Sequence, residues 1–367
     1  MAARDKAQLN ILVVRPDRIG DVVLSTPVFE VLKKHYPQSK LTVMVREGVA
    51  PLVRGIPFVD QVMIFDPEGR HSGTRGFFNL ASEVRAGNFR IAVVLQSQWK
   101  IAAALFKARI KYRVGPLSKP HSFVFYNRGL RQRRASVEMH ETDYNLQLLR
   151  KLGIRVGTRS IPTRLYVSDA ARELARQWLL EHAWNQQKPL VVVHPGMGGS
   201  ALNWPENHYI DFIRAIIKEG NQVLVTGGPT EGSILLRIQQ ELGALKERVM
   251  FYGGPSAGSI DDLAGLLSWS DLVVAPSTGP LHIAVALGKP VVSFYPPIRV
   301  QSALRWGPYL PDDSKASVLV PEIYCGEDFK CRGNVCNYFP CMKSLTVPQA
   351  LEEARRLMLQ NKDVQNV

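Results

Sequence analysis

The chain has 367 residues, of which 46% are apolar and 21% charged, and its formal net charge is +14. This length is sufficient for two domains of ordinary size, each with its own hydrophobic core. No apolar run approaches the ~20 residues that span a bilayer, and the N-terminus lacks the apolar core of a secretion signal. We therefore expect a cytoplasmic protein and exclude an integral membrane protein.

The positive charge lies in one half of the chain. Residues 1–188 contain 31 Lys and Arg against 15 Asp and Glu, whereas residues 189–367 contain 15 against 17. A basic half favours anionic partners such as nucleic acid, a phosphorylated glycolipid or an acidic membrane surface. Charge needed only for solubility would not gather in one half, so we infer a functional basic face.

Strand and helix patterns alternate along the first half. Short apolar runs are separated by helical patterns, which is typical of a mostly parallel α/β sheet with helices on both faces. We predict strands at 11–14, 41–45, 61–65, 91–95 and 111–115, and helices near 26–35, 48–54, 77–86, 99–108, 140–152 and 168–183.

Residues 116–140 interrupt this alternation and are predicted to be irregular. They carry an arginine-rich run whose guanidinium forks suit phosphate and carboxylate, although such a run can also be ordinary solvated surface. The polar segment 185–189 ends in proline and is the predicted interdomain linker. The arginines of the run are Arg128, Arg131, Arg133 and Arg134.

A second α/β series follows the linker. We predict two doubly wound domains, at 1–185 and 189–345, that face each other across a cleft at the carboxyl ends of their strands. The predicted strands begin the segments 190–196, 222–228, 249–252, 271–280 and 290–295, and the predicted helices lie at 206–219, 231–242, 259–269 and 281–287.

The first strand ends in a charged turn, R-P-D-R-I-G-D at 15–21. Gly20 relieves the turn, and Asp21 falls at the start of the next helix, where a negative charge suits the helix dipole. This edge of a parallel sheet is where α/β proteins keep their chemistry. Asp21 is therefore either a helix cap or a functional carboxylate.

Three turns of the second half are rich in Gly and hydroxyl residues: HPGMGGS at 194–200, TGGPTEG at 226–232 and PSTGPLH at 276–282. Gly lets the backbone approach a ligand, and a helix start favours phosphate. One such turn has a steric explanation in any α/β fold, but three together predict a nucleotide or pyrophosphate pocket. The chain lacks G-x-G-x-x-G after its first strand and lacks a P-loop, which disfavours a classical NAD domain or a P-loop NTPase.

In this order, R-P-D-R-I-G-D at 15–21, H-P-G at 194–196 with N-W-P at 203–205, and S-T-G-P-L-H at 277–282 resemble glycosyltransferase family 9, the bacterial lipopolysaccharide heptosyltransferases. The resemblance spans about residues 11–345. It implies a GT-B architecture of two Rossmann-like domains facing a central cleft. The acceptor would bind the N-terminal domain and the sugar nucleotide the C-terminal one. In this family the last helix, here about 347–360, often returns to the first domain.

The resemblance implies an inverting transferase that moves heptose from ADP-heptose to Kdo or heptose of the inner core without a metal or other cofactor. Asp21 would be the general base that takes the acceptor's proton. Helix dipoles and backbone N–H groups can stabilise a diphosphate leaving group without a metal. Pro280 donates no hydrogen bond, but its fixed φ suits a first helical turn.

The resemblance and the turn chemistry together assign residues to two sites. Cations would position the anionic acceptor or the donor diphosphate: Arg15, Arg18, Arg128, Arg131, Arg133 and Arg134. The donor site would comprise His194, Gly196, Gly198, Gly199, Ser200, Thr226, Gly227, Glu231, Ser277, Thr278, Gly279, Pro280 and His282.

Four positions of the donor half need comment. Glu231 matches an acidic position that reaches the nucleotide ribose in the family, although it could merely decorate a helix start. His282 is a motif position and could equally be a satisfied structural histidine. Ser277 stands where several members have Asp, and Leu202 stands where a Lys or Arg commonly precedes N-W-P. These two departures leave the donor's identity open.

The four cysteines, Cys325, Cys331, Cys336 and Cys341, follow the pattern C-x5-C-x4-C-x4-C. Structural zinc sites usually contain C-x2-4-C pairs, so reduced thiols in a loop are favoured over a metal cluster, and disulfides fit a cytoplasmic protein least. Cys-rich tails also occur at this place in many family members.

We expect a monomer in peripheral contact with the cytoplasmic face of a Gram-negative inner membrane, without nucleic acid. Two alternatives are a sugar-nucleotide epimerase or hydrolase of the same fold and a non-enzymatic anion-binding or nucleic-acid-binding protein. The epimerase or hydrolase would need no lipid acceptor. Against the nucleic-acid-binding protein, aromatic residues do not interleave with the arginine run as single-strand binders require.

Overall fold

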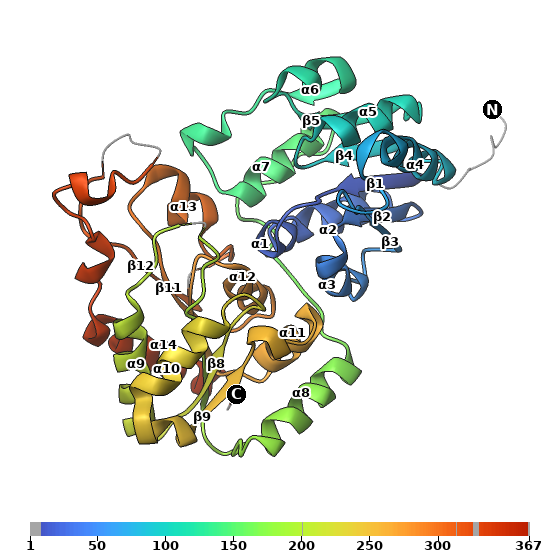
Figure 1. The fold of residues 1–367 in the computed structure, drawn as a ribbon. Coiled ribbons are helices and arrows are strands. Elements are labelled where there is room, and N and C mark those ends of the chain that lie inside the picture. Colours follow the sequence, from blue (N-terminus) through green and yellow to red (C-terminus); the bar gives the residue numbers. More distant parts are fainter. Residues whose placement is uncertain (1–8, 200, 313, 326–329, 366–367) are drawn as a thin grey trace. The chain divides into compact units, whose positions relative to one another are not determined.

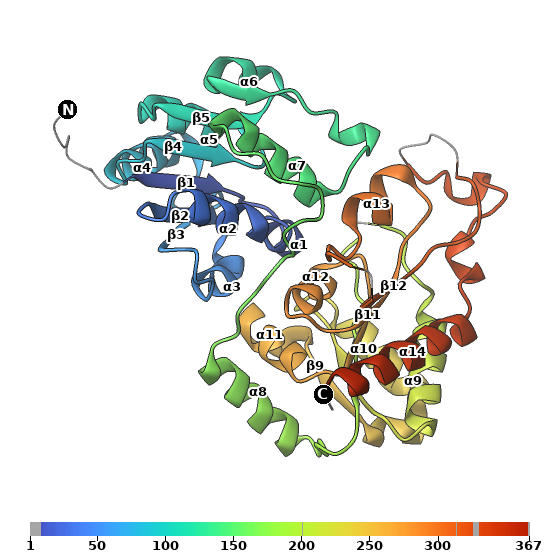
Figure 2. The same ribbon diagram turned by 180° about the vertical axis from the view of Figure 1, so that it is seen from behind.

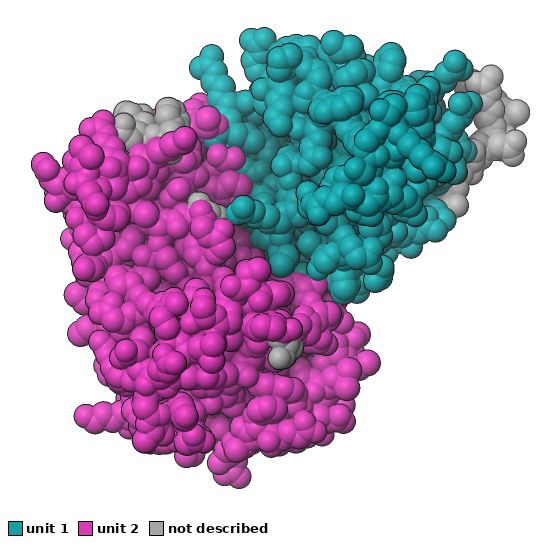
Figure 3. Space-filling view, in the orientation of Figure 1, with its two compact units in different colours: residues 1–134, 141–165 teal, residues 135–140, 166–367 magenta. Residues whose placement is uncertain are grey.

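The computed structural model describes residues 9–199, 201–312, 314–325 and 330–365. The chain divides into two compact units, coloured separately in Figure 3. Unit 1 comprises residues 1–134 and 141–165, and unit 2 comprises residues 135–140 and 166–367. Within the described residues, each unit is built on one six-stranded parallel sheet.

The sheet of unit 1 has the strand order β3-β2-β1-β4-β5-β6, the doubly wound order of Rossmann folds (Figure 1). Its strands are β1 (Asn10–Val14), β2 (Lys40–Val45), β3 (Gln61–Ile64), β4 (Ile91–Val94), β5 (Tyr112–Pro116) and β6 (Arg128–Leu130). Its helices are α1 (Ile19–Val23), α2 (Thr26–His35), α3 (Ala50–Arg54), α4 (Gly73–Ala86), α5 (Trp99–Lys107), α6 (Pro120–Phe125) and α7 (Glu141–Gln147).

Continuous apolar runs place β1 and β4 at the centre of this sheet. Both strands lack accessible surface along nearly their whole length, as expected for strands covered on both faces. α4 and α5 cover one face, where Leu80 and Leu105 pack in one cluster with Leu12 of β1. This burial fixes the carboxyl end of β1, from which the charged turn leaves.

The sheet of unit 2 has the order β12-β11-β10-β7-β8-β9, so β7 occupies the place that β1 has in unit 1. Its strands are β7 (Leu190–Val193), β8 (Gln222–Thr226), β9 (Val249–Tyr252), β10 (Leu272–Pro276), β11 (Val291–Phe294) and β12 (Ala316–Leu319). Its helices are α8 (Asp169–Glu181), α9 (Glu206–Lys218), α10 (Gly232–Leu242), α11 (Ile260–Ser268), α12 (Gly279–Ala286), α13 (Ala303–Trp306) and α14 (Val347–Gln365).

The predicted strands and helices are confirmed, with shifts of a few residues at their ends. The predicted irregularity of 116–140 is wrong, because this segment contains α6 and β6. β6 pairs with β5 at the sheet edge, and its Arg128 and Gly129 hide the strand pattern. β12 and α13 were not predicted. None of the helices within the described ranges is both long and apolar enough to cross a membrane.

The predicted domain boundary differs from the observed units. α8 belongs to unit 2, where it packs against α11, so the chain changes unit at 165/166 and the segment 185–189 lies within unit 2. α14 packs on α9 and β11, as Figure 2 shows, and Ala350, Ala354 and Leu357 enter the core of unit 2. The expected return of the last helix to the first domain stays a prediction.

Candidate active site

Asp21 lies near the carboxyl edge of the sheet of unit 1, in the first turn of α1. The N-cap of this helix is Arg18, and no side chain makes a capping hydrogen bond. The interpretation of Asp21 as the helix cap is therefore wrong. Its negative charge still lies near the positive end of the helix dipole.

A buried arginine holds Asp21 in place. Nη2 of Arg15 lies 2.5 Å from Oδ1 of Asp21 and 3.3 Å from Oε1 of Glu141, and Nε of Arg15 lies 2.9 Å from Oδ2 of Asp17. The Arg15 side chain is 3% exposed and that of Asp21 is 20% exposed. Within the described residues, Oδ2 of Asp21 has no hydrogen-bond partner. One carboxylate oxygen is fixed, and the other is free to bind a ligand.

Burial and charge act in opposite directions on this cluster. Burial alone would lower the pKa of Arg15, but the charges of Asp21, Glu141 and Asp17 raise it overall, so Arg15 stays positively charged. Burial raises the pKa of Asp17 to about 6, against the opposing effect of Arg15. Arg15 is thus the permanent charge around which the carboxylates are arranged.

Glu141, the first residue of α7, belongs to this cluster and was not predicted. It is 2% exposed, and Nη1 of Arg134 lies 2.5 Å from its Oε1. The next residue, Thr142, donates a hydrogen bond to the carbonyl of Leu24. A signal was present in the sequence: E-T-D-Y-N at 141–145 has polar side chains on all sides of a helix, which an amphipathic surface helix does not need.

Two of the predicted acceptor-binding arginines are engaged within unit 1. Arg15 is buried and contacts Asp21, and its predicted contact with an acceptor stays a prediction. Arg134 binds Glu141 and is half-buried. By contrast, Arg18 is exposed, and its side chain has no hydrogen-bond or ion-pair partner among the residues that the structure describes.

The other three predicted acceptor-binding arginines lie at the surface. Cζ of Arg128 lies 4.4 Å from the ring centre of Tyr112, and Cζ of Arg131 lies 5.9 Å from that of Phe123. Arg133 is also exposed. Acceptor binding by Arg18 and by these three residues stays a prediction.

In unit 2, His194 directly follows β7. Its Nδ1 shares a hydrogen bond of 3.0 Å with Oγ1 of Thr226, and its Nε2 lies 3.6 Å from Oε2 of Glu231. Burial lowers the pKa of His194, although the Glu231 charge and the Thr226 contact oppose this effect. We therefore treat the imidazole as neutral at pH 7, so that its contact with Glu231 is not an ion pair.

Glu231 links two of the predicted donor turns. It is the N-cap residue of α10, and its Oε2 accepts a hydrogen bond of 2.7 Å from the N–H of Gly228. A Cβ at Gly196 would lie 2.1 Å from the carboxylate atoms of Glu231. Gly196 therefore makes room for Glu231. Contact of Glu231 with a nucleotide ribose stays a prediction.

Backbone conformation and packing explain three further glycines. Gly198 and Gly199 have φ angles of 57° and 71°, a left-handed region that favours Gly, and a Cβ at either would meet no atom within 4 Å. A Cβ at Gly227 would lie 3.1 Å from Leu235. Ser200, also predicted to bind the donor, lies outside the described residues.

The third glycine turn leads into α12 and contains buried polar atoms without partners. Thr278 is the N-cap residue, Gly279 begins the helix, and Pro280 is in its first turn. Oγ1 of Thr278 and Nδ1 of His282 are buried and bind no partner within the described residues. Buried polar atoms are normally satisfied and helix N-termini attract phosphate, so this turn suits an anionic ligand.

His282 and Ser277 flank this turn and are both uncharged at neutral pH. Burial, with a smaller effect of neighbouring His140, lowers the pKa of His282 to about 3. Ser277 hydrogen-bonds to Tyr295, whose pKa burial raises and this bond partly lowers. A neutral His282 can share a hydrogen bond with a ligand but is not a proton donor for catalysis at pH 7.

The segment N-W-P anchors the tail of the chain. Trp204 is 2% exposed, stacks on Phe294 at 4.2 Å between ring centres, and donates a hydrogen bond of 2.7 Å to the carbonyl of Leu345. Asn203 donates to the carbonyl of Pro195. Leu202, which stands in place of the family's cation, packs against the core of unit 2, where an apolar side chain is favoured.

The four cysteines line one small cavity in unit 2 together with Leu202 and Ile298. No disulfide joins them, and burial, together with the other three cysteines, raises the pKa of the Cys341 thiol. Among the described residues, no group of three or more His, Cys, Asp or Glu is arranged to hold a metal ion. The predicted absence of a metal remains a prediction.

Comparison with known proteins places these features in a family. Residues 77–336 match the family "Glycosyltransferase family 9 (heptosyltransferase)". A putative glycosyltransferase of Haemophilus influenzae is 33% identical over 316 residues, covering 85% of this chain and 89% of that protein. Lipopolysaccharide heptosyltransferase 2 of Escherichia coli is 25% identical over 364 residues, covering 96% and 99%.

A solved structure supports the predicted fold class. The E. coli ADP-heptose lps heptosyltransferase II superposes with a TM-score of 0.78 at 22% identity, covering 96% of this chain and all of that one. The predicted α/β class with two Rossmann-like domains is confirmed by the two sheets and by this similarity. The predicted cleft between the domains stays a prediction.

Proposed function

The chain belongs to glycosyltransferase family 9, and on that premise we propose that it transfers a heptose from ADP-heptose to Kdo or heptose of the lipopolysaccharide inner core. The observation that carries this proposal is the state of Asp21. Arg15 fixes one carboxylate oxygen, and the other has no partner among the described residues. Such a group can accept a proton without first breaking a contact.

In the proposed reaction, Asp21 is the general base and the configuration at the anomeric carbon is inverted. The acceptor hydroxyl oxygen forms a bond to the anomeric carbon while the bond from that carbon to the diphosphate breaks. The hydroxyl proton passes to Asp21, and ADP leaves with the electron pair. Arg15 keeps the carboxylate oriented, because its Nη2 lies 2.5 Å from Oδ1 of Asp21.

Donor binding in unit 2 is proposed at the turn before α12. Oγ1 of Thr278 and Nδ1 of His282 are buried polar atoms that a nucleotide could satisfy, and the helix dipole would stabilise the diphosphate without a metal. Glu231, held against Gly228, is the proposed ribose contact. Support for ADP-heptose comes from the similarity to the E. coli ADP-heptose lps heptosyltransferase II and from this anion-suited turn.

An anionic, lipid-linked acceptor fits the basic first half, in which Lys and Arg number 31 against 15 acidic residues in 1–188. Exposed Arg18 is close to Asp21 in sequence and is the proposed acceptor contact. We further propose that the protein acts as a monomer at the cytoplasmic face of the inner membrane. Kdo and lipid A carry negative charges, which these cations would attract.

The test is a transfer assay with purified protein, ADP-heptose and a Kdo-bearing lipid A acceptor, with products identified by mass spectrometry. We expect the acceptor to gain one heptose and ADP to be released only when the acceptor is present. A thermal-shift series with ADP, UDP and GDP accompanies it, because a ligand of the folded state raises the melting temperature.

The outcomes separate the alternatives. Conversion of the sugar nucleotide without an acceptor would assign an epimerase or hydrolase instead. Transfer from a UDP-sugar or GDP-sugar, with the matching nucleotide giving the larger thermal shift, would retain the transferase and overturn the donor. Unchanged transfer after chelation of divalent ions is expected, since the proposed leaving-group stabilisation uses no metal.

A further inference from the structure

The middle of unit 1 is exceptionally basic. Residues 84–134 contain twelve Lys and Arg and not a single Asp or Glu. This stretch includes the helices α5 and α6 and the strands β4, β5 and β6. A solvated surface ordinarily carries both signs of charge, so a stretch whose charged side chains are all cationic is unusual.

Large apolar side chains are exposed within this basic stretch and on neighbouring α4. Such side chains would normally be buried, and isolated ones need no explanation. Here they lie on three consecutive helices, of which α5 packs against both α4 and α6. They are Phe78 (50% exposed), Trp99 (61%), Phe106 (51%), Phe123 (54%) and Val124 (69%).

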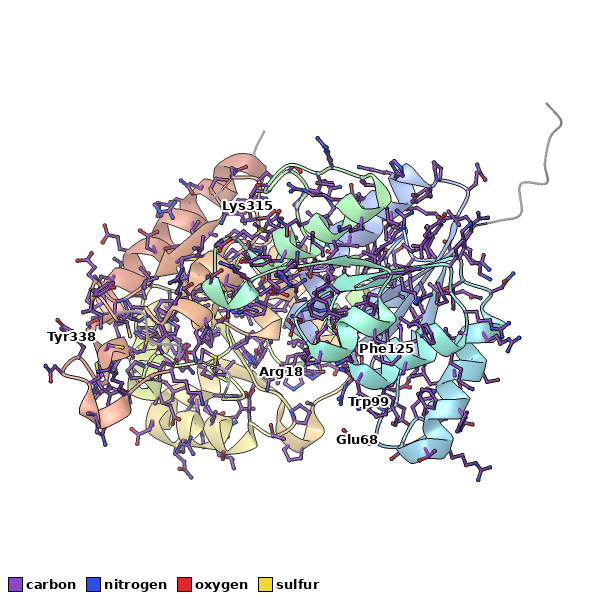
Figure 4. All side chains as sticks on the ribbon, turned by 90° about the horizontal axis from the view of Figure 1, so that it is seen from above. Arg18, Glu68, Trp99, Phe125, Lys315 and Tyr338 are labelled. Atoms are coloured by element: carbon purple, nitrogen blue, oxygen red, sulfur yellow. The ribbon has the colours of Figure 1, made fainter. Side chains whose placement is uncertain are left out.

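Contacts across the helices join α4, α5 and α6 into one surface. Nζ of Lys107 on α5 lies 5.1 Å from the ring centre of Phe78 on α4. Phe106 on α5 contacts Phe125 on α6 at 5.7 Å between ring centres, and Figure 4 labels Phe125 and Trp99 on these helices. Trp99 and Phe106 are seven residues apart, which places them on the same side of α5.

Two arginines lie over aromatic rings of this surface. Cζ of Arg113 lies 5.2 Å from the ring centre of Phe106, and Cζ of Arg131 lies 5.9 Å from that of Phe123. Arg113 also donates hydrogen bonds to the carbonyls of Ile110 and Phe125, whereas Arg131 is exposed. We call this surface the aromatic–basic face. It comprises five exposed apolar residues, Phe78, Trp99, Phe106, Phe123 and Val124, and three exposed cations, Lys107, Arg109 and Arg131.

We propose that the aromatic–basic face docks unit 1 on an anionic lipid bilayer. Its Trp and Phe side chains would enter the headgroup region, where amphipathic aromatic groups are favoured, and its cations would bind anionic headgroups. Val124, the most exposed of the set, has no aromatic ring to stack on a base, which favours lipid over nucleic acid. The inference rests on the proposed function insofar as a lipid-linked acceptor gives docking its purpose.

The test is co-sedimentation of the full chain with vesicles of phosphatidylglycerol and phosphatidylethanolamine, and with vesicles of phosphatidylcholine alone. Wild-type protein should bind the anionic vesicles about tenfold or more tightly than the neutral ones and lose that preference in high salt. Two variants remove the face: Trp99→Ala/Phe106→Ala/Phe123→Ala removes apolar contacts, and Lys107→Glu/Arg109→Glu reverses charge. Both should reduce binding to anionic vesicles by about tenfold or more.

Matched control variants change equally exposed residues elsewhere. Leu174→Ala/Leu236→Ala/Leu359→Ala replaces three apolar side chains that are 59–64% exposed in unit 2, and Arg54→Glu/Lys246→Glu makes the same change in net charge. Both should bind vesicles like wild type. Circular dichroism and melting temperatures will establish that all variants are folded.

Equal vesicle binding by the face variants and the controls would overturn the proposal, as would no binding by wild type. Tighter binding of wild type to single-stranded RNA than to anionic vesicles would assign the face to nucleic acid instead. A soluble, deacylated acceptor separates docking from catalysis: the face variants should transfer sugar to it at the wild-type rate. If neither the wild type nor any variant transfers sugar, the proposed function fails, but the result on vesicle binding still stands.

Discussion

β1 and β7 occupy the same place in two sheets of the same strand order, yet the turn after β1 is charged and the turn after β7 is not. After β1, Arg15 is buried among three carboxylates. After β7, His194 is held neutral by burial and is followed by glycine-rich backbone. The same topology therefore carries a fixed charge suited to proton transfer in unit 1, and an uncharged turn in unit 2 where backbone dipoles can act on an anion.

The largest expected effect is on the charged side of this comparison. Replacing Asp21 by Asn keeps the shape of the side chain but removes the proton acceptor, so transfer should fall by about 10²- to 10⁴-fold. Initial rates in the heptose-transfer assay measure this, and the thermal shift with ADP should be unchanged. Asp169→Asn is the matched control, because Asp169 is exposed in the first turn of α8. Near-normal transfer by Asp21→Asn would remove the catalytic role of Asp21.

Arg15→Met tests whether the buried charge of Arg15 also stabilises the fold of unit 1. The variant leaves Asp17, Asp21 and Glu141 without their shared cation, and breaking a buried ion pair typically costs about 3–5 kcal/mol. The melting temperature should fall substantially, and transfer should fall with it. Arg18→Met, which removes an exposed arginine, should leave the melting temperature nearly unchanged. A variant of Arg15 as stable as wild type would mean that the cluster does not hold unit 1 together.

The pH dependence of stability tests whether the buried His282 of unit 2 is neutral. An unfolded histidine gains its proton near pH 6.5, whereas the folded pKa is about 3, so below pH 6.5 the unfolded state binds the extra proton. Stability therefore falls as the solution is acidified, by up to about 2 kcal/mol between pH 6.5 and 5.

His282→Gln should accordingly lose less of its melting temperature between pH 7 and pH 5 than wild type loses. The raised pKa of Asp17 acts in the opposite direction. A group that holds its proton more tightly in the folded state makes the folded protein less stable as the pH rises. That contribution is common to both proteins and cancels in the difference. Exposed His35→Gln is the control, and an identical pH response of His282→Gln and wild type would contradict the assignment of a neutral His282.

The smallest expected effect concerns the glycine turns. Gly196→Ala places a methyl group on the carboxylate of Glu231 and should displace it from the N–H of Gly228, at a cost of about 1 kcal/mol. The melting temperature should fall by a few degrees, and the thermal shift with ADP should shrink. Gly48→Ala is the matched control, because a Cβ there meets no atom within 4 Å. If both variants behave alike, Gly196 has no steric role.

Much of the fold could be predicted because a buried parallel strand is recognisable from the few residues that form it. The runs ILVV, LVVV and LVVA are apolar on both faces and are bounded by turn residues. These strands can therefore be predicted without knowledge of their tertiary contacts. The domain boundary could not be predicted in this way. Proline and polar residues at 185–189 look like a linker, but what assigns α8 to unit 2 is its packing on α11, about ninety residues further along.

The candidate site was predictable in its motifs and not in its contacts. Asp21 and the three glycine turns stand next to strand ends, where the pattern places them. The burial of Arg15, by contrast, depends on Glu141, which is 126 residues away in the chain. A turn sequence gives no sign of a partner that distant, so an arginine that resembled an open cation proved to be the buried centre of a cluster.

Residues 135–140 belong to unit 2, although unit 1 continues on both sides of them in the chain. Within unit 2, the ring of His140 contacts that of Tyr309 at 4.7 Å between ring centres, and its Nε2 donates to the carbonyl of Gly307. A single cut in the chain therefore cannot yield two complete halves. In a chimera that exchanges unit 1 for that of a relative, the six-residue segment has to be inherited with unit 2.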